Sequence, residues 1–143
     1  MSIPVRASLL GLLARAEHRA TARLEAALRG EDLSTEQWRV LSLLADGGGH
    51  PMSEIAGYAM VPAPTLTKIV DRLIDRTLVY RRVDSVDRRR VLVFLSDRGA
   101  ELYARLDVAV DAAERELAEV LGEPDAIALT ELLLRLLERL DRP

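Results

Sequence analysis

Basic side chains gather in one part of this 143-residue sequence, between Pro62 and Arg90. The segment has eight basic and four acidic residues, a net charge of +4, whereas the whole chain carries −3 and the remainder therefore −7. Local positive charge in an acidic chain indicates a polyanionic partner, with double-stranded DNA as the first candidate. The basic residues of the segment are Lys68, Arg72, Arg76, Arg81, Arg82, Arg88, Arg89 and Arg90.

Residues 64–76 predict a helix with one buried and one exposed face. Pro64 suits the first helical position, where a backbone N–H would lack a partner anyway. Apolar residues recur at helical spacing along one side, at Leu66, Ile69, Val70 and Leu73. The polar side offers Thr65, Thr67, Lys68 and Arg72. In a major groove Lys and Arg bind guanine edges and Thr contacts a thymine methyl group or a phosphate, so this side could read base sequence.

Residues 78–83 and 91–95 predict a β-hairpin, because both runs are rich in β-branched and aromatic residues. Its charged turn ends in three arginines that could enter a narrow minor groove, where the negative potential is strongest: Arg88, Arg89 and Arg90. Asp87 could hold one of them through a bidentate pair.

Two further arginines, Arg81 and Arg82, lie on opposite faces of the first strand, since side chains alternate along a strand. We expect one to face a DNA phosphate and the other to pair with a structural acid, and we favour Arg82 for the phosphate.

Catalytic patterns are absent from the sequence. The two histidines, His18 and His50, have no metal-ligand spacing, and Gly47–Gly49 lacks the Lys-Ser/Thr of a phosphate-binding loop. The carboxylates alternate with arginines, as on solvated helix faces. We therefore expect no enzyme, no metal and no cofactor.

The composition further restricts the possible binding partners and the cellular location. With no cysteine, the chain has no disulfide, thiolate zinc site or cysteine redox sensor, which fits a cytoplasmic protein. Charged residues interrupt the apolar N-terminus, so we expect neither a signal peptide nor a membrane span. Only five aromatic residues occur, which disfavours recognition of single-stranded nucleic acid by stacking.

Helices are expected on both sides of the basic segment. Apolar spacing predicts a long helix from Pro4 to about Arg29, ended by Gly30. A second helix follows the capping-box pattern Ser34–Gln37 and ends at the glycine run, and a short helix begins at Ser53.

Two more helices complete the chain, one from about Asp97 to Val120 with Ser96 as its cap, and one from Asp125 to Leu140. The last helix has more leucines than one buried stripe requires. Together with the leucine-rich first helix, it predicts a twofold homodimer. A last helix buried in its own core is the alternative.

The sequence resembles the MarR-type winged helix-turn-helix regulators. The resemblance lies in residues 64–73, PTLTKIVDRL, and in residues 87–96, DRRRVLVFLS, followed by Gly99. The second run looks like the wing signature of that family, in which an Asp and an Arg two residues later precede a strand that ends in Leu-Ser or Leu-Thr. The order of elements agrees from Val5 to Leu140.

The resemblance implies a mainly α fold, of the α+β kind, with a winged helix-turn-helix between long N- and C-terminal dimerisation helices. It implies a single domain, 1–143, with a dimerisation region at 1–33 and 97–143 and a DNA-binding region at 34–96. Residues 53–59 and 64–76 would be the two helices of the helix-turn-helix. The expected DNA contacts are Ser53, Pro64, Thr65, Thr67, Lys68, Arg72, Arg82, Asp87, Arg88, Arg89 and Arg90.

Members of this family are mostly homodimeric repressors, and many release DNA when a small anionic or phenolic effector binds. Arg89 would be the minor-groove arginine, supported by Asp87. Arg15 and His18, one turn apart, could line an effector cavity near the dimer junction. Trp38 is a further ligand candidate, although we expect it to lie in the core.

Thr77 departs from the family pattern, because a glycine usually follows the recognition helix and provides positive φ. The absence of cysteine excludes the peroxide-sensing branch.

The leading hypothesis is thus a repressor whose operator is an inverted repeat, with half-sites about 34 Å apart. The alternative is a dimeric interaction module that keeps this fold without binding DNA. Under that alternative the basic helix face is only solvated, and the arginines of the turn only protect a hairpin edge.

Overall fold

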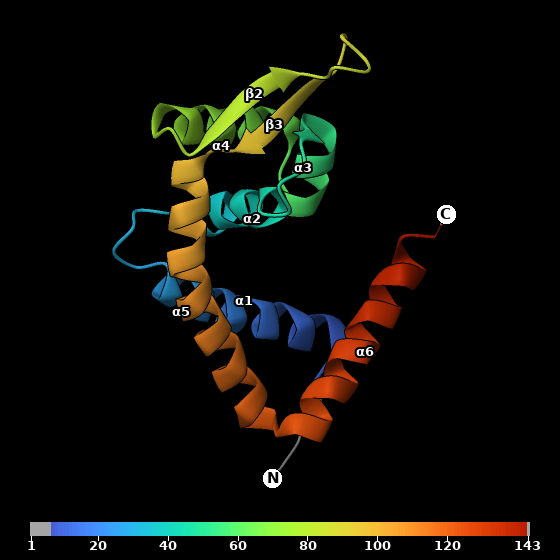
Figure 1. Cartoon of the computed structure of the whole chain (residues 1–143). Helices are drawn as coiled ribbons and strands as arrows, with labels where there is room; N and C mark the ends of the chain where they lie inside the picture. Colours follow the sequence, from blue (N-terminus) through green and yellow to red (C-terminus); the bar gives the residue numbers. More distant parts are fainter. Residues whose placement is uncertain (1–6, 143) are drawn as a thin grey trace.

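The computed structural model describes residues 7–142 as a mainly helical chain with one small sheet (Figure 1). The elements are α1 (Leu9–Ala27), α2 (Thr35–Leu44), β1 (His50–Pro51), α3 (Met52–Ala59), α4 (Ala63–Asp75), β2 (Val79–Val83), β3 (Val91–Leu95), α5 (Asp97–Leu121) and α6 (Glu123–Leu140). The predicted helices and hairpin are all present. The predicted start of the first helix at Pro4 lies outside the described residues.

The sheet contains a strand that the sequence did not predict. Its antiparallel order is β1-β3-β2, with Val79 opposite Leu95 and His50 opposite Val93. The two residues of β1 follow a glycine run that was interpreted only as a helix break. Gly49 permits the pairing, because a Cβ atom there would collide with the ring of Phe94.

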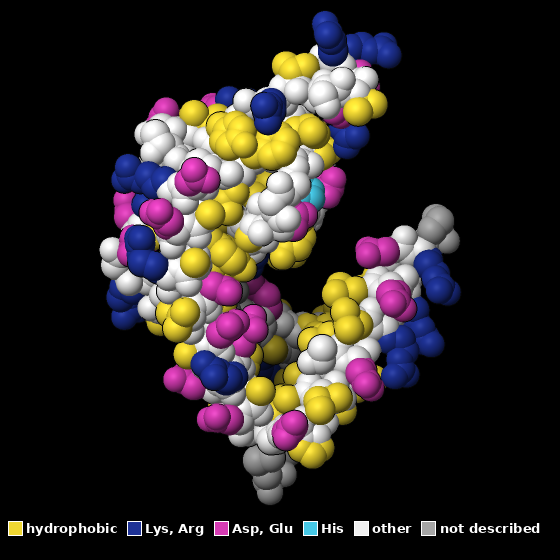
Figure 2. Space-filling model, viewed as in Figure 1, with side chains coloured by type: hydrophobic (Ala, Val, Ile, Leu, Met, Phe, Trp, Pro, Cys, Tyr) yellow, Lys and Arg dark blue, Asp and Glu magenta, His cyan; other side chains and the backbone are white. Residues whose placement is uncertain are grey.

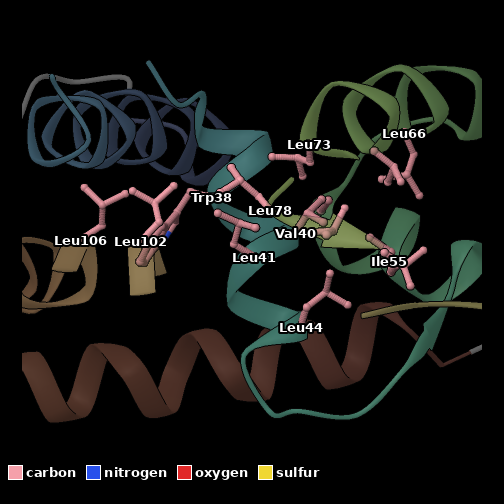
Figure 3. Close-up of a cluster of buried hydrophobic side chains, with 14 of the residues drawn as sticks. Trp38, Val40, Leu41, Leu44, Ile55, Leu66, Leu73, Leu78, Leu102 and Leu106 are labelled. Carbon is pink, nitrogen blue, oxygen red and sulfur yellow. The ribbon is translucent and has the colours of Figure 1, made fainter. Parts of the chain in front are cut away.

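The hydrophobic core is built around α2. Its side chains Val40, Leu41 and Leu44 are fully buried. Figure 3 shows them between two groups of residues, Ile55 and Leu66 toward the sheet and Leu102 and Leu106 on α5. Each such side chain contributes about 1.5–3 kcal/mol when it leaves water. The helix therefore joins the part of the chain that carries the sheet to the long helix α5.

Serine side chains cap the starts of α2 and α5. The predicted capping box is present, since Ser34 Oγ accepts from Gln37 N at 3.1 Å and Ser34 N donates to Gln37 Oε1 at 3.0 Å. Ser96 caps α5 by accepting from Gly99 N at 3.0 Å.

Two predicted starts were wrong by one residue. The short helix begins at Met52 instead of Ser53, and Pro51 is its N-cap residue. The next helix begins at Ala63, so Pro64 occupies the second helical position, where a missing N–H also costs no helical hydrogen bond.

The last helix, α6, contains no buried residue. It diverges from α5 after Gly122, which has φ of 88°. Seven of its apolar residues are between 37% and 70% exposed, namely Ile127, Leu129, Leu132, Leu133, Leu134, Leu137 and Leu140. The alternative that this helix lies deep in its own core is wrong. Within residues 7–142, no helix is both long enough and apolar enough to span a bilayer.

The turn after α4 places Thr77 at φ of 59°. Leu78 N donates to Leu73 O at 2.9 Å, and Thr77 N donates to Ile74 O at 2.8 Å. This is the Schellman pattern, whose αL position is usually a glycine. A β-branched residue therefore adopts the conformation that glycine adopts without strain.

A histidine flanked by two carboxylates joins three elements of the fold. His50 Nε2 lies 2.7 Å from Asp46 Oδ2, and His50 Nδ1 lies 2.7 Å from Glu54 Oε1. Only the protonated ring can donate from both nitrogens. Burial by itself lowers the pKa of His50, but the hydrogen bonds and charges of Glu54 and Asp46 outweigh it and raise the pKa above 6.5. The His50 ring thus ties β1 to the end of α2 and to the start of α3.

We predict that Thr77→Gly increases the free energy of unfolding by about 0.5–1 kcal/mol, because relief of the strain exceeds the added freedom of the unfolded chain. Urea denaturation measures the change. Thr67→Gly is the matched control, since Thr67 also bonds a local carbonyl but lies inside α4. The control should be destabilised, and a loss of stability in both variants would contradict the interpretation.

We predict that His50→Gln lowers the free energy of unfolding at pH about 6 by about 1 kcal/mol and has less effect at pH about 9. A raised pKa in the folded chain stabilises it fully below the unfolded value of 6.5, and this contribution is lost as pH rises through the folded pKa. Thermal denaturation across this range checks it. His18→Gln is the control at the other histidine, and a pH-independent difference for His50→Gln would refute the charged arrangement.

Candidate nucleic-acid interface

The polar face of α4 points away from the core because Leu66, Val70 and Leu73 are fully buried. The residues predicted to read bases all lie on the opposite, exposed side: Pro64, Thr65, Thr67, Lys68 and Arg72. Thr67 Oγ1 donates to Ala63 O at 3.1 Å, so its hydroxyl hydrogen is used within the helix. The structure thus gathers five predicted contacts on one surface, which we call the α4 face.

Asp71 is neutralised by a strand residue rather than by its neighbours on α4. Arg81 Nη2 lies 2.7 Å from Asp71 Oδ1. Arg81 is therefore the arginine that pairs with a structural acid, as one of the two was expected to do. Among the described residues, Lys68 and Arg72 form no ion pair. The pair leaves the cations of the α4 face free to bind another anion.

Arg82 occupies the other face of the sheet. It is exposed, and its cross-strand partner is Leu92, whereas Arg81 is opposite Val93. The separation of the two arginines follows from the alternation of side chains along β2. Contact of Arg82 with a phosphate stays a prediction.

The turn between β2 and β3, residues 84–90, is shaped by its acidic residues. Asp84 Oδ1 accepts from Val86 N at 3.0 Å, and Asp87 Oδ1 accepts from Arg89 N at 3.1 Å. Arg90 N donates to Asp87 O at 2.9 Å. Both carboxylates therefore hold backbone N–H groups, as Asp does in turns.

The predicted bidentate pair between Asp87 and an arginine is wrong for this structure. Arg89 Nε lies 3.7 Å from Asp87 Oδ1, a single long contact, and the Arg89 side chain is 96% exposed. The short contact to Asp87 Oδ1 comes instead from the backbone N–H of Arg89. Asp87 thus positions the arginine through the main chain.

The turn projects beyond the body of the protein and carries Lys or Arg side chains at its end (Figures 1 and 2). Arg88, Arg89 and Arg90 are all exposed there. We call these three residues the hairpin tip. In Figure 1 the tip lies well away from α4, so the predicted contacts form two separate surfaces. Ser53 is exposed in the first turn of α3 and belongs to neither.

The three predicted effector residues do not meet within the chain. Trp38 is 5% exposed and stacks on Tyr103, with ring centroids 4.9 Å apart, so its expected place in the core is confirmed. Arg15 and His18 are exposed on α1, with no described contact to Trp38. The sequence reasoning did not single out Tyr103, whose pKa is raised by burial and by nearby Asp107.

A hollow of about 580 Å³ lies between α1, α2 and the end of α3. Its one basic lining residue is Arg39, which adjoins Trp38 in the sequence. The position of Arg39 next to Trp38 could have marked it as a lining residue of this hollow, but the sequence analysis did not single it out. Within residues 7–142 no cluster of three or more metal-binding side chains occurs.

Known proteins resemble this chain in both sequence and structure. A sequence model of the MarR family matches residues 33–91, which include the α4 face and the hairpin tip. The HTH-type transcriptional regulator FarR of Neisseria gonorrhoeae is 35% identical over 109 residues, which cover 76% of this chain and 75% of FarR.

Two solved structures are similar over nearly the whole chain. NadR in complex with 4-hydroxyphenylacetate superposes with a TM-score of 0.79 at 31% identity, covering 95% of this chain and 96% of NadR. The transcriptional repressor CouR, bound to a 23-mer DNA duplex, superposes with a TM-score of 0.83 at 29% identity, covering 90% and 92%.

Proposed function

The chain belongs to the MarR family, and from that premise we propose that it is a homodimeric transcriptional repressor that binds an inverted repeat in double-stranded DNA. Its fold is a winged helix-turn-helix, with α3 and α4 as the helix-turn-helix and β2 and β3 as the wing. The relatives named above are transcriptional regulators rather than enzymes.

The observation that carries the proposal is the presence of two exposed basic surfaces on rigid supports. The α4 face has the width of a helix, which a major groove admits. The hairpin tip is narrow and bears three arginines, which suits an adjacent minor groove. Two acids beside these surfaces are engaged, Asp71 by Arg81 and Asp87 by the backbone N–H of Arg89. The ion pair with Arg81 offsets the charge of Asp71 next to the α4 face.

The assignment of regions follows from these surfaces. Residues 34–96 form the proposed DNA-binding region, in which Ser53 and Arg82 add phosphate contacts beside the α4 face. Residues 1–33 and 97–143 form the proposed dimerisation region. A repressor of this kind acts on DNA in the cytoplasm.

The apolar side of α6 supports the dimer. Figure 2 shows hydrophobic side chains on its inner side, toward the hollow of the molecule, and basic side chains on its outer side. Seven apolar residues of this helix are at least 37% exposed in the single chain. Exposed apolar surface of this extent marks an interface, and an equivalent surface on a second copy can cover it.

A small anionic or phenolic effector is also proposed. The similar NadR structure contains 4-hydroxyphenylacetate, a phenol that bears a carboxylate. Trp38 offers little surface to such a compound, because it is 5% exposed and one face of its ring stacks on Tyr103. Arg15 and His18 would take part only at the dimer junction, since they are exposed on α1 within one chain.

We predict that Arg89→Ala weakens operator binding at least tenfold and reduces the slope of log affinity against log salt by about 1 for each half-site. The reason is the loss of one phosphate-neutralising guanidinium from the hairpin tip. Gel-shift titrations at several salt concentrations with the promoter of its own gene measure both quantities.

Arg135→Ala removes the same charge from the exposed face of α6 and should leave both quantities unchanged. An unchanged affinity and slope for Arg89→Ala would show that the wing assignment is wrong. Failure of the wild-type protein to bind any promoter DNA would favour the interaction module that lacks DNA binding.

We predict that Leu137→Glu converts the dimer to a monomer without unfolding the chain. Leu137 is 56% exposed, so a charge there disrupts a covering partner rather than the core. Light scattering after size exclusion measures the mass, and circular dichroism reports the fold. Arg135→Glu places the same side chain on the polar side of α6 and should remain dimeric. A dimeric Leu137→Glu would place the interface elsewhere.

A further inference from the structure

Arg76, at the C-terminal cap of α4, contacts the loop between α1 and α2. Its Nη1 donates to Asp32 O at 2.8 Å, and its Nη2 donates to Glu31 O at 3.0 Å. One guanidinium thus holds two consecutive backbone carbonyls that lie 44 and 45 residues away in the sequence. The planar fork of arginine is suited to such a two-point contact, and a lysine ammonium is not.

The loop held by Arg76 has an unusual backbone. Gly30 has φ of 100° and Asp32 has φ of 49°. Positive φ at a residue other than glycine is uncommon and persists where the surroundings hold it. The one backbone hydrogen bond donated by Glu31 is long, 3.4 Å to Leu28 O. The bonds from Arg76 are therefore the short polar contacts that hold this turn.

The same loop also reaches α5. Glu31 Oε1 lies 3.5 Å from Arg105 Nη2, so Glu31 contacts α5 through its side chain and α4 through its carbonyl. Leu28, just before the loop, is buried in the core. The loop is thus a strap between the recognition helix and the long helices α1 and α5.

A second connection between α4 and α5 lies at Thr77. Ser96 Oγ, at the start of α5, donates to Thr77 O at 2.6 Å. Gly99 lies so close that an added Cβ would collide with the carbonyl oxygen of Leu78. With a single such contact, α4 could rotate about it. Contacts to two different elements, the loop between α1 and α2 and the start of α5, fix the angle of α4 relative to them.

The contact between α2 and α5 is apolar. Trp38 on α2 packs against Tyr103, Leu102 and Leu106 on α5. Apolar attraction is non-directional and tolerates small rotations. Hydrogen bonds weaken steeply when their angle changes. The ion pair between Asp71 and Arg81 holds α4 to β2. Directional contacts toward the α1–α2 loop and α5 lie at the C-terminal end of α4, at Arg76 and Thr77.

We propose that Arg76 is a positioning residue that fixes the angle of α4 relative to α1 and α5, and thereby the half-site spacing that the dimer reads. The effect on half-site spacing rests on the proposed function. Arg76 lies about 16 Å along the helix from Thr65, so a rotation of about 10° at the cap moves the reading end by about 3 Å. A shift of that size is close to one base-pair step.

The angle can be measured without DNA and within one chain of the dimer. Because the chain has no cysteine, Ala22→Cys on α1 and Thr65→Cys on α4 give two unique spin-label sites, both exposed. Excess unlabelled chain restricts the signal to intrachain distances. The parent protein should give one narrow distance distribution, Arg76→Gln a broadened one, and Arg76→Lys an intermediate one.

Arg29→Gln is the matched control, since Arg29 is exposed at the end of α1 and forms no ion pair among the described residues. Its distribution should match that of the parent. A distribution for Arg76→Gln as narrow as that of the parent would overturn the proposal, whether or not the protein binds DNA.

The consequence for DNA is tested with operators whose centre is lengthened or shortened by one base pair. The wild-type protein should lose at least tenfold in affinity for the altered spacings. Arg76→Gln should bind the native operator about tenfold more weakly and distinguish the three spacings by less than threefold, with an unchanged salt slope.

Each contrary outcome has a separate meaning. A salt slope reduced by about 1 per half-site would make Arg76 a phosphate contact and overturn the proposal. If Arg76→Gln still discriminated among the spacings and only melted at a lower temperature, the role of Arg76 would be purely structural. That result would also overturn the proposal. Absence of wild-type binding to every operator would refute the proposed function, while the distance distributions still decide the restraint on α4.

Discussion

The burial of one stripe of α4 is the constraint on which the rest of this structure depends. Leu66, Val70 and Leu73 are inaccessible to solvent against α2 and α3. Removing three such side chains from water contributes several kcal/mol, which is comparable to the net stability of a whole domain. The rotation of the helix about its own axis is therefore fixed. Every polar residue of its opposite face must then point outward together.

Acidic residues close to the basic surfaces serve the architecture. Asp71 binds Arg81 and so fastens the strand to α4, while Asp84 and Asp87 form the turn of the wing through backbone N–H groups. Asp46 and Glu54 hold the ring of His50 beside the start of α3. An acidic chain can thus present a basic surface, because carboxylates such as Asp71 are paired within the fold.

Much of this arrangement could be read from the sequence. The 3.6-residue period gave six helices, and the capping box at Ser34 and the cap at Ser96 lie where they were expected. Thr77 was identified as the unusual position, and its φ of 59° agrees. Boundaries at Met52 and Ala63 were missed by one residue, because a proline near a helix start is compatible with more than one position.

The sequence by itself determined which faces are apolar and which are charged, because periodicity fixes the side of a helix or strand on which each residue lies. Only the tertiary structure decided which charges meet. Arg81 finds Asp71 ten residues away, and Arg76 finds the carbonyls of Glu31 and Asp32 across more than forty. Such contacts depend on how elements cross in space, and an arginine side chain is long enough to reach several partners. Local pattern cannot choose among them.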